Sequence, residues 1–195
     1  MLLPTPLAPA RVAPRRGGEA WAASGKEVGA ALGALATLGQ QGSPAWSAFA
    51  RVAARLPAGR LACGDVASVC NAFARAGAAD EALFARMSEL ALGKRGWDAA
   101  AAGAVANALV RAGAADTTLM AHLSREVCAL PPAEIAPVPA ARLLNACARL
   151  TLRDDALLAH LSAALRACPP DELDPQTVAN AAHASAVLHV ADVAL

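Results

Sequence analysis

Residues 69–80 read VCNAFARAGAAD, and residues 105–116 read VANALVRAGAAD. The pattern returns as NACARLT from Asn145 and as NAAHASA from Asn180, and a weaker copy, GALATLG, begins at Gly33. The starting positions 33, 71, 107, 145 and 180 are 35 to 38 residues apart. A repeat of this length is the sequence signature of a helical-repeat array.

Each copy predicts two helices, which we call helix A and helix B. In the second copy, helix A covers about residues 65–76, Gly77 ends it, and Asp80 is placed to cap helix B. Asp116 and Asp154 lie at the same offset in the next two copies. Helix B then carries apolar residues four positions apart, on one face: Leu83 and Met87, Leu119 and Leu123, Leu157 and Leu161.

The segments between copies add further signals. Residues 131–135 (PPAEI) and 169–173 (PPDEL) each predict a short helical turn. Asp174 followed by Pro175 predicts the N-cap and first residue of another helix A. A two-helix unit of this size cannot bury its apolar face alone, but stacked units can. We therefore expect an all-α fold, an α-solenoid of two-helix repeats over residues 26–195, with about four copies and a truncated fifth.

Composition supports helices and excludes several classes of protein. Aromatic residues make up 3% of the chain and tyrosine is absent, so the residues that favour strands are scarce. No run of about 20 large apolar residues predicts a membrane span. The five cysteines show no zinc-ligand spacing, which predicts reduced thiols and no metal. No phosphate-binding, metalloprotease or nucleophile motif occurs, so we expect neither an enzyme nor a cofactor.

The first 25 residues differ from the rest. Arg11, Arg15 and Arg16 precede the first acid, Glu19, and prolines interrupt the segment. An organellar targeting peptide has this arginine bias, and an unstructured arm fits the prolines equally well. Both interpretations stay open for residues 1–25. Residues 1–60 carry seven Lys/Arg against two acids, and the remainder carries ten against fourteen. Any nucleic-acid binding must therefore come from a local basic surface.

A helical wheel of helix A predicts such a surface. With about 100° per residue, Val69 and Phe73 face helix B, whereas Asn71 points away from it and Arg75 lies about 40° from Asn71. The other copies repeat the pair four residues apart. We call this surface the Asn/Arg ridge: Asn71, Arg75, Asn107, Arg111, Asn145 and Arg149. A second column lies fifteen residues after each asparagine, in helix B: Arg86, His122 and His160.

The ridge fits single-stranded RNA. Arginine can bind phosphate or stack on a base, and asparagine can pair with a base edge. Other interpretations stay open: asparagine can instead bond to the backbone of the next repeat and lock the stack, and arginines on an outer ridge are often merely solvated. The two histidines are a whole repeat apart, too far to share a metal, and are typical of surface or packing residues.

The phrases VANALVRAGAADTTLMAHLSREV and DPQTVANAAHASAVLHVADVAL resemble the repeats of organellar RNA-binding proteins. Similar repeats occur in the FAST-kinase-like leucine-rich proteins with RAP domains, in octotricopeptide and heptatricopeptide repeat proteins, and in the helical-repeat subunit of the RNA-editing substrate-binding complex. The resemblance covers residues 26–195. It implies a module that binds single-stranded RNA, with ribonucleoprotein subunits as further candidate partners, in mitochondrial or alternatively plastid RNA processing, stability or translation.

A protein–protein scaffold of the armadillo or HEAT type is the alternative. Solenoid grooves also hold peptides and partner helices. The net charge of +1 and the few aromatic residues favour this alternative, because single-stranded RNA is commonly bound on basic surfaces with aromatic stacking platforms.

Overall fold

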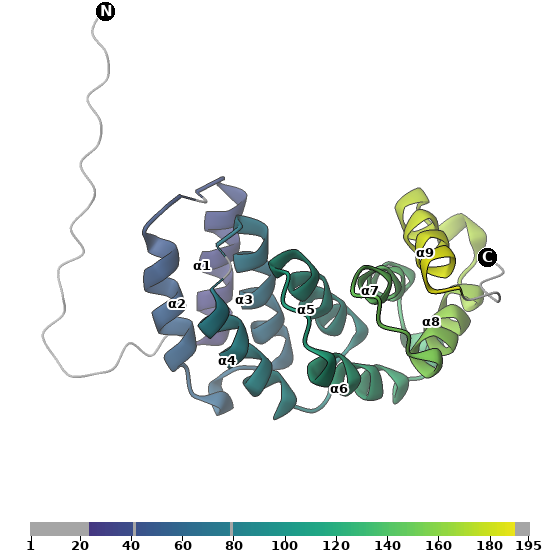
Figure 1. Cartoon of the computed structure of the whole chain (residues 1–195), viewed down its shortest axis with the longest axis horizontal. Helices are drawn as coiled ribbons and strands as arrows, with labels where there is room; N and C mark the ends of the chain where they lie inside the picture. The colour runs from purple at the N-terminus through teal and green to yellow at the C-terminus, as the bar shows by residue number, and fades with distance from the viewer. Residues whose placement is uncertain (1–23, 41, 79, 190–195) are drawn as a thin grey trace, which may run out of the picture.

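The computed structural model describes residues 24–40, 42–78 and 80–189, and these residues form two rows of helices (Figure 1). The A row consists of α1 (Gly25–Thr37), α3 (Cys63–Ala76), α5 (Ala99–Ala112), α7 (Pro137–Arg149) and α9 (Pro175–Leu188). The B row consists of α2 (Ala45–Arg55), α4 (Glu81–Leu92), α6 (Thr117–Cys128) and α8 (Asp155–Ala167). Short 3-10 helices follow three of the B helices: η1 (Ala58–Arg60), η2 (Pro132–Glu134) and η3 (Pro170–Glu172).

The helices stack in the order of the repeats. Each A helix packs along the A helix of the next repeat, each B helix packs against the next B helix, and helices A and B of one repeat pack together. In Figure 1 the two rows follow a shallow arc, with the A row along its inner side. The described residues contain no strand, and the predicted α-solenoid is confirmed.

The predicted caps begin and end the helices. Three aspartates accept a hydrogen bond from the backbone N–H three residues later: Asp80 from Leu83 (2.8 Å), Asp116 from Leu119 (2.9 Å) and Asp154 from Leu157 (3.0 Å). Helices α3 and α5 end at Gly77 and Gly113, whose φ angles of 63° and 66° are left-handed, a conformation that glycine adopts without steric cost. In the fourth repeat Thr151 takes this place with φ 53°.

The linkers also follow the sequence. The turns predicted over residues 131–135 and 169–173 are η2 and η3. Asp174 caps α9 by accepting a hydrogen bond from the N–H of Thr177 (2.9 Å), with Pro175 as the first helical residue. The predicted leader, residues 1–25, lies outside the described residues except for Ser24 and Gly25, which begin α1. The residues predicted to start helix B of the fifth repeat lie outside them too.

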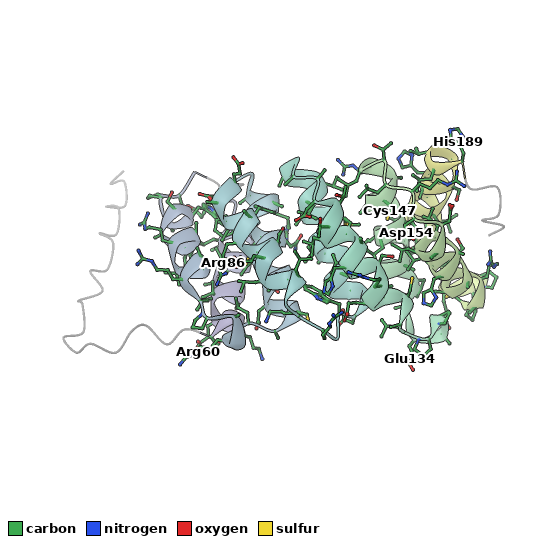
Figure 2. The ribbon with its side chains drawn as sticks, turned by 60° about the horizontal axis from the view of Figure 1, so that its bottom comes forward. Arg60, Arg86, Glu134, Cys147, Asp154 and His189 are labelled. Carbon is green, nitrogen blue, oxygen red and sulfur yellow. The ribbon has the colours of Figure 1, made fainter. Side chains whose placement is uncertain are left out.

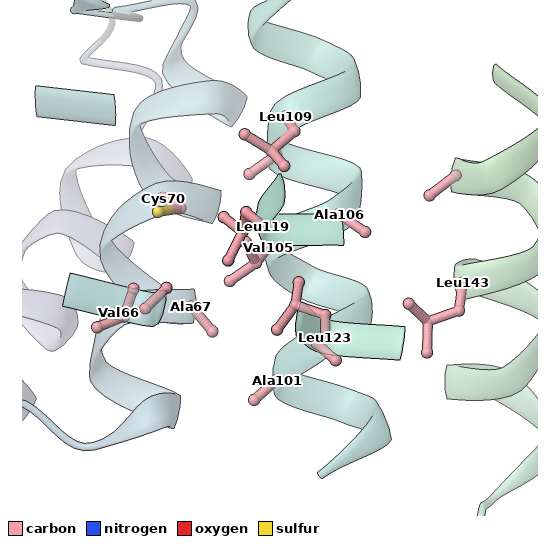
Figure 3. Close-up of a cluster of buried hydrophobic side chains, with 14 of the residues drawn as sticks. Val66, Ala67, Cys70, Ala101, Val105, Ala106, Leu109, Leu119, Leu123 and Leu143 are labelled. Atoms are coloured by element: carbon pink, nitrogen blue, oxygen red, sulfur yellow. The ribbon is translucent and has the colours of Figure 1, made fainter. Parts of the chain in front are cut away.

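The core runs continuously between the rows. The positions two before and two after each ridge asparagine face helix B and are buried: Val69, Phe73, Val105, Leu109, Leu143 and Cys147. Figure 3 shows α5 side chains such as Val105 between α3 and the α6 residues Leu119 and Leu123. Burial of this kind stabilises the stack by roughly 25 cal/mol per Å² of apolar surface.

Small residues let the A helices approach closely. The position after each asparagine is an alanine, and Ala72, Ala108, Ala146 and Ala181 are all buried. In α5, a Cβ placed on Gly103 would lie 3.5 Å from Leu143 Cγ of α7. The corresponding alanine of the first repeat, Ala34, is exposed. The reason is that this position faces the preceding repeat, and none is described before α1.

Candidate functional site

The Asn/Arg ridge lies on the free side of the A row. Each A helix uses one side for helix B and its two flanks for neighbouring A helices, which leaves one side uncovered. Asn71, Asn107 and Asn145 are half-buried on that side, and the arginine one turn later in each helix is exposed. Because the B row lies on the outer side of the arc, the ridge faces the inner side (Figure 1). The structure thus brings all six predicted ridge residues onto one surface.

The asparagine amides are available for a ligand. Among the described residues, the side chains of Asn71, Asn107 and Asn145 form no hydrogen bond with the neighbouring repeat or with any other group. The interpretation in which they lock the stack through backbone bonds is therefore not what the structure shows. An amide offers two donors and an acceptor, so each ridge asparagine keeps its hydrogen-bonding groups at the surface.

The ridge arginines are not engaged either. Within the described part of the chain, Arg75, Arg111 and Arg149 form no ion pair, whereas three other arginines do: Arg86 with Glu89, Arg95 with Glu126 and Arg153 with Asp155. Each ridge arginine is in the last turn of its helix, where a cation also interacts favourably with the helix dipole. Their guanidinium groups remain free to bind an anion.

Arg142 adjoins the ridge, and the sequence analysis missed it. It is exposed on α7, three residues before Asn145 and seven before Arg149. Seven residues make about two turns and about 10.5 Å of rise, so the two arginines lie above one another on one side of α7. The position three before the asparagine holds Ala30, Ser68, Ala104 or Thr177 in the other repeats. A search for repeated residue types cannot find a residue that occurs once.

The charge of the two rows differs in sign. Helices α3, α5, α7 and α9 with their N-caps contain four arginines and three acids, Asp65, Asp98 and Asp174. Helices α4, α6 and α8 with their N-caps contain three arginines and seven acids. A surface lined by one sign of charge attracts ligands of the other sign. The three acids of the A row lie at the N-terminal ends of their helices, whereas Arg75, Arg111 and Arg149 lie in the last turns, so the positive charge of the A row gathers toward the C-terminal ends of its helices.

The ridge weakens at both ends of the stack. In the first repeat, Gly33 and Thr37 take the places of asparagine and arginine. In the fifth, the Oδ1 of Asn180 accepts a hydrogen bond from Gln176 Nε2 (3.0 Å), and the arginine position is the buried Ala184. Three consecutive repeats therefore make up the ridge.

The predicted helix-B column does not form a second surface. His122 is only 3% exposed, and its Nε2–H donates to the carbonyl oxygen of Lys94 (2.9 Å) in the linker before α5. His160 is half-buried and its Nε2 is buried. Arg86, on α4 (Figure 2), pairs with Glu89 at 2.7 Å. The inclusion of His122 among ligand-binding residues was wrong, because this position faces the preceding linker.

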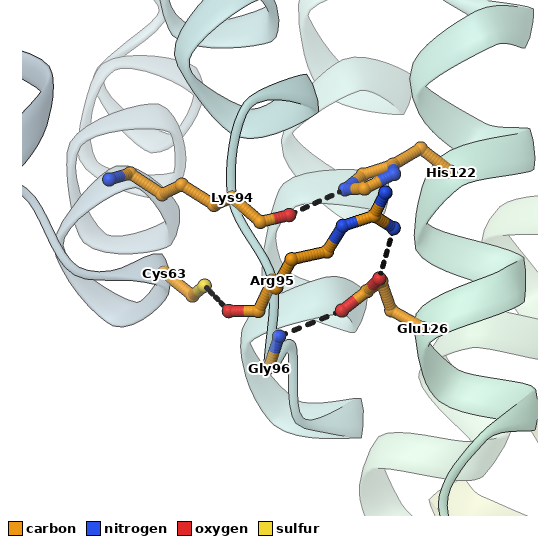
Figure 4. A network of polar contacts seen from close by, with 6 residues as sticks. All are labelled: Cys63, Lys94, Arg95, Gly96, His122 and Glu126. Atoms are coloured by element: carbon orange, nitrogen blue, oxygen red, sulfur yellow. Dashed lines mark hydrogen bonds and ion pairs between the residues drawn. The ribbon is translucent and has the colours of Figure 1, made fainter.

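That linker explains why a histidine is buried there (Figure 4). Residues 94–96 connect the second and third repeats without a 3-10 helix, and α6 holds them in place. Glu126 accepts hydrogen bonds from the Arg95 guanidinium (2.8 Å) and from the Gly96 N–H (2.7 Å). The Lys94 ammonium donates to the carbonyl oxygens of Ala58 and Leu61. The polar groups of this segment are structural.

Two general properties complete the site. No helix among the described residues has the length and hydropathy needed to cross a membrane. Within the same residues, no three His, Cys, Asp or Glu side chains lie close enough together to hold a metal ion.

The comparisons with known proteins assign the chain to no family. Neither the protein-family models nor the curated proteins with which the chain was compared match it. The free arginines and asparagines of the ridge are therefore what a functional proposal rests on.

Proposed function

We propose that the chain is a non-catalytic RNA-binding module that holds single-stranded RNA along the Asn/Arg ridge. One observation carries the proposal: in three consecutive repeats, an unpaired arginine and an unbonded asparagine stand one turn apart on the free side of the A row. The acids of that row lie at helix N-termini, away from the ridge arginines in the last turns, and this separation supports a polyanionic ligand on the ridge. The resemblance of the repeats to organellar RNA-binding proteins supports RNA as that ligand.

The chemistry of the pair suits a nucleotide strand. The guanidinium carries a fixed charge and a planar fork of donors that fits phosphate and also stacks on bases. The half-buried amide can bond to the edge of an unpaired base, which is how single-stranded RNA is read. Packed helices are about 8–10 Å apart, so the pairs repeat at short, regular intervals across the stack.

RNA binding by a triple variant tests the proposal. Phosphate contacts release counterions, so the logarithm of the affinity for a single strand falls with the logarithm of the salt concentration by about 0.7 per contact. Replacement of Arg75, Arg111 and Arg149 together by alanine is expected to make this slope shallower by about 2. The measurement is fluorescence anisotropy of a labelled single-stranded RNA in a series of salt concentrations.

A matched control separates the ridge from net charge. Arg51, Arg55 and Arg125 are exposed on B helices, and their replacement by alanine removes the same three charges. We expect this control to keep the wild-type slope, apart from a small decrease because three fewer positive charges weaken the electrostatic attraction of the whole chain for RNA. Equal slopes in the two triple variants would contradict a binding site on the ridge. Absence of RNA binding, with protein partners that survive ribonuclease treatment, would favour the scaffold alternative.

We extend the proposal to an organellar role, in mitochondria or alternatively in plastids, in RNA processing, stability or translation. It rests on the resemblance and on the three arginines that precede Glu19. A reporter fused to residues 1–25 is expected to enter mitochondria or plastids, as detected by microscopy and protease protection. A reporter that stays entirely in the cytosol would contradict targeting by this segment.

A further inference from the structure

Arg142 is a charged side chain of the A row that the Asn/Arg ridge does not account for. It is exposed on α7, and within the described part of the chain it forms no ion pair. Helix α7 packs between α5 and α9 (Figure 1). The equivalent residues of those two helices are Ala104 and Thr177, and neither carries a charge that could pair with Arg142. Its guanidinium is therefore available to a ligand.

Arg142 occupies a different place along its helix from the ridge arginines. Arg75, Arg111 and Arg149 each follow an asparagine by four residues and lie in the last turn of a helix, so they form one row across the stack. Arg142 precedes Asn145 by three residues and lies about two turns from Arg149 on the same side of α7. Among the described A helices, α7 alone has an arginine on each side of its asparagine.

The base of the Arg142 side chain is held at the contact between α5 and α7. A Cβ placed on the buried Gly103 of α5 would lie 3.8 Å from Arg142 Cβ. The first carbon of the side chain thus lies against the neighbouring helix. Because this packing restricts the side chain, less conformational entropy is lost when its guanidinium binds a ligand.

The order of the three side chains on α7 decides which part of a nucleotide Arg142 would meet. In the proposed complex, the row of ridge arginines binds the phosphates and the asparagines bind the edges of the bases. The bases therefore lie on the asparagine side of the arginine row, toward the N-terminal ends of the A helices. Arg142 lies beyond Asn145 in that direction, so it faces a base and not the sugar-phosphate backbone.

We propose that Arg142 makes the α7 position of the ridge selective for guanine. The inference rests on the proposed binding of single-stranded RNA along the ridge. The planar fork of a guanidinium donates two hydrogen bonds to O6 and N7 of guanine, which is the commonest specific contact of arginine with a base. At α3 and α5, Ser68 and Ala104 take the place of Arg142, so the same selectivity is not expected there. One guanosine in a strand would therefore fix its register on the ridge.

Fluorescence anisotropy with labelled oligouridines tests this selectivity. One strand contains only uridine, and in two others a single central uridine is replaced by guanosine or by adenosine. Adenine is the matched base, because it keeps N7 but has an amino group in place of O6. The full chain is expected to bind the guanosine strand about tenfold more tightly than either of the other strands.

Variants of the chain assign the preference to the guanidinium. Arg142→Ala is expected to abolish the preference for the guanosine strand. Arg142→Lys should abolish it too, because lysine keeps the charge but lacks the planar fork. Arg125→Ala is the matched control, since Arg125 is exposed on α6 in the B row, and it is expected to keep the full preference.

The outcomes distinguish this inference from the proposed function. If the wild-type chain binds none of the strands, RNA binding and the inference built on it are both contradicted. Saturable binding with equal affinity for the guanosine and adenosine strands would overturn the selectivity and leave RNA binding standing. A preference that persists in Arg142→Ala would also overturn it. So would an equal loss of affinity for all three strands with a salt slope shallower by about 0.7, because Arg142 would then be one more phosphate contact.

Discussion

At the scale of single residues, Glu126 is the side chain that fixes the linker between the second and third repeats. Only 13% of its side chain is exposed, and it bonds to both Arg95 and the backbone of Gly96. The hydrogen bond from Arg95, followed by those from the linker backbone, lowers the pKa of the Glu126 carboxyl below its ordinary value of 4.5. The folded protein therefore binds this proton less tightly than the unfolded chain does.

Glu126→Gln is expected to lower the free energy of unfolding by about 1–2 kcal/mol near neutral pH, because a charge-assisted bond is lost at a mostly buried site. Since the folded pKa is depressed, the contribution is complete above pH 4.5 and is lost as the pH falls through the folded value. The difference in unfolding free energy between Glu126→Gln and the wild type should thus become smaller as the pH falls below 4.5. Glu89→Gln is the control: Glu89 is 71% exposed in its pair with Arg86, so a change below about 0.5 kcal/mol is expected in urea denaturation. A larger loss of unfolding free energy for Glu89→Gln than for Glu126→Gln would contradict this ranking.

Burial predicts a difference in reactivity among the five cysteines, of which Cys70 and Cys147 are buried and the others half-buried. Desolvation raises the pKa of Cys70 and of Cys147 to about 12. Because only the thiolate reacts, iodoacetamide at pH 8 is expected to modify Cys63, Cys128 and Cys168 first. Cys70 and Cys147 should be modified only after unfolding, as peptide mass spectrometry would show. Fast modification of Cys70 in the native protein would contradict its place between α3 and α5.

At the scale of elements, the fourth repeat carries a strained helix end. Thr151 has φ 53° at the position where Gly77 and Gly113 end the helices of the preceding repeats. A β-branched residue in this conformation costs on the order of 1–3 kcal/mol. Thr151→Gly is therefore expected to stabilise the protein by about 1 kcal/mol in thermal or urea unfolding, and Gly113→Thr should destabilise it by a similar amount. A loss of stability in Thr151→Gly would show that the threonine side chain makes a compensating contact.

The aspartate caps predict a ranking among the B helices. Asp116 accepts one hydrogen bond from the start of α6, whereas Asp154 accepts one from the start of α8 and another from Ser124 of α6. Loss of a cap costs about 1 kcal/mol. Asp154→Ala should cost about 1–3 kcal/mol more than Asp116→Ala, because it also leaves the buried Ser124 hydroxyl unpaired. Equal losses of unfolding free energy for Asp116→Ala and Asp154→Ala, measured by urea denaturation, would contradict the hydrogen bond between Ser124 and Asp154.

At the scale of the whole molecule, periodicity predicted the fold because the second, third and fourth repeats share the aspartate cap of helix B and the alanine after the asparagine. Asp80, Gly77 and the alanine after each asparagine act locally, so a single sequence suffices to place them. The site was less predictable. A helical wheel showed which side of helix A is free, but it could not show that His122 faces the preceding linker, because that contact joins residues 28 positions apart. Arg142 was not predicted because no other repeat has an arginine at the equivalent position.

The placement of the ligand along the A row can be measured directly by crosslinking the purified full-length chain to a single-stranded RNA that contains photoreactive uridines, followed by mass spectrometry of the adducts. Adducts are expected on peptides from α3, α5 and α7, around Asn71, Asn107 and Asn145, and they should disappear from the triple variant of Arg75, Arg111 and Arg149. Adducts confined to α4, α6 and α8, or no adducts at all, would contradict RNA binding on the inner side of the arc.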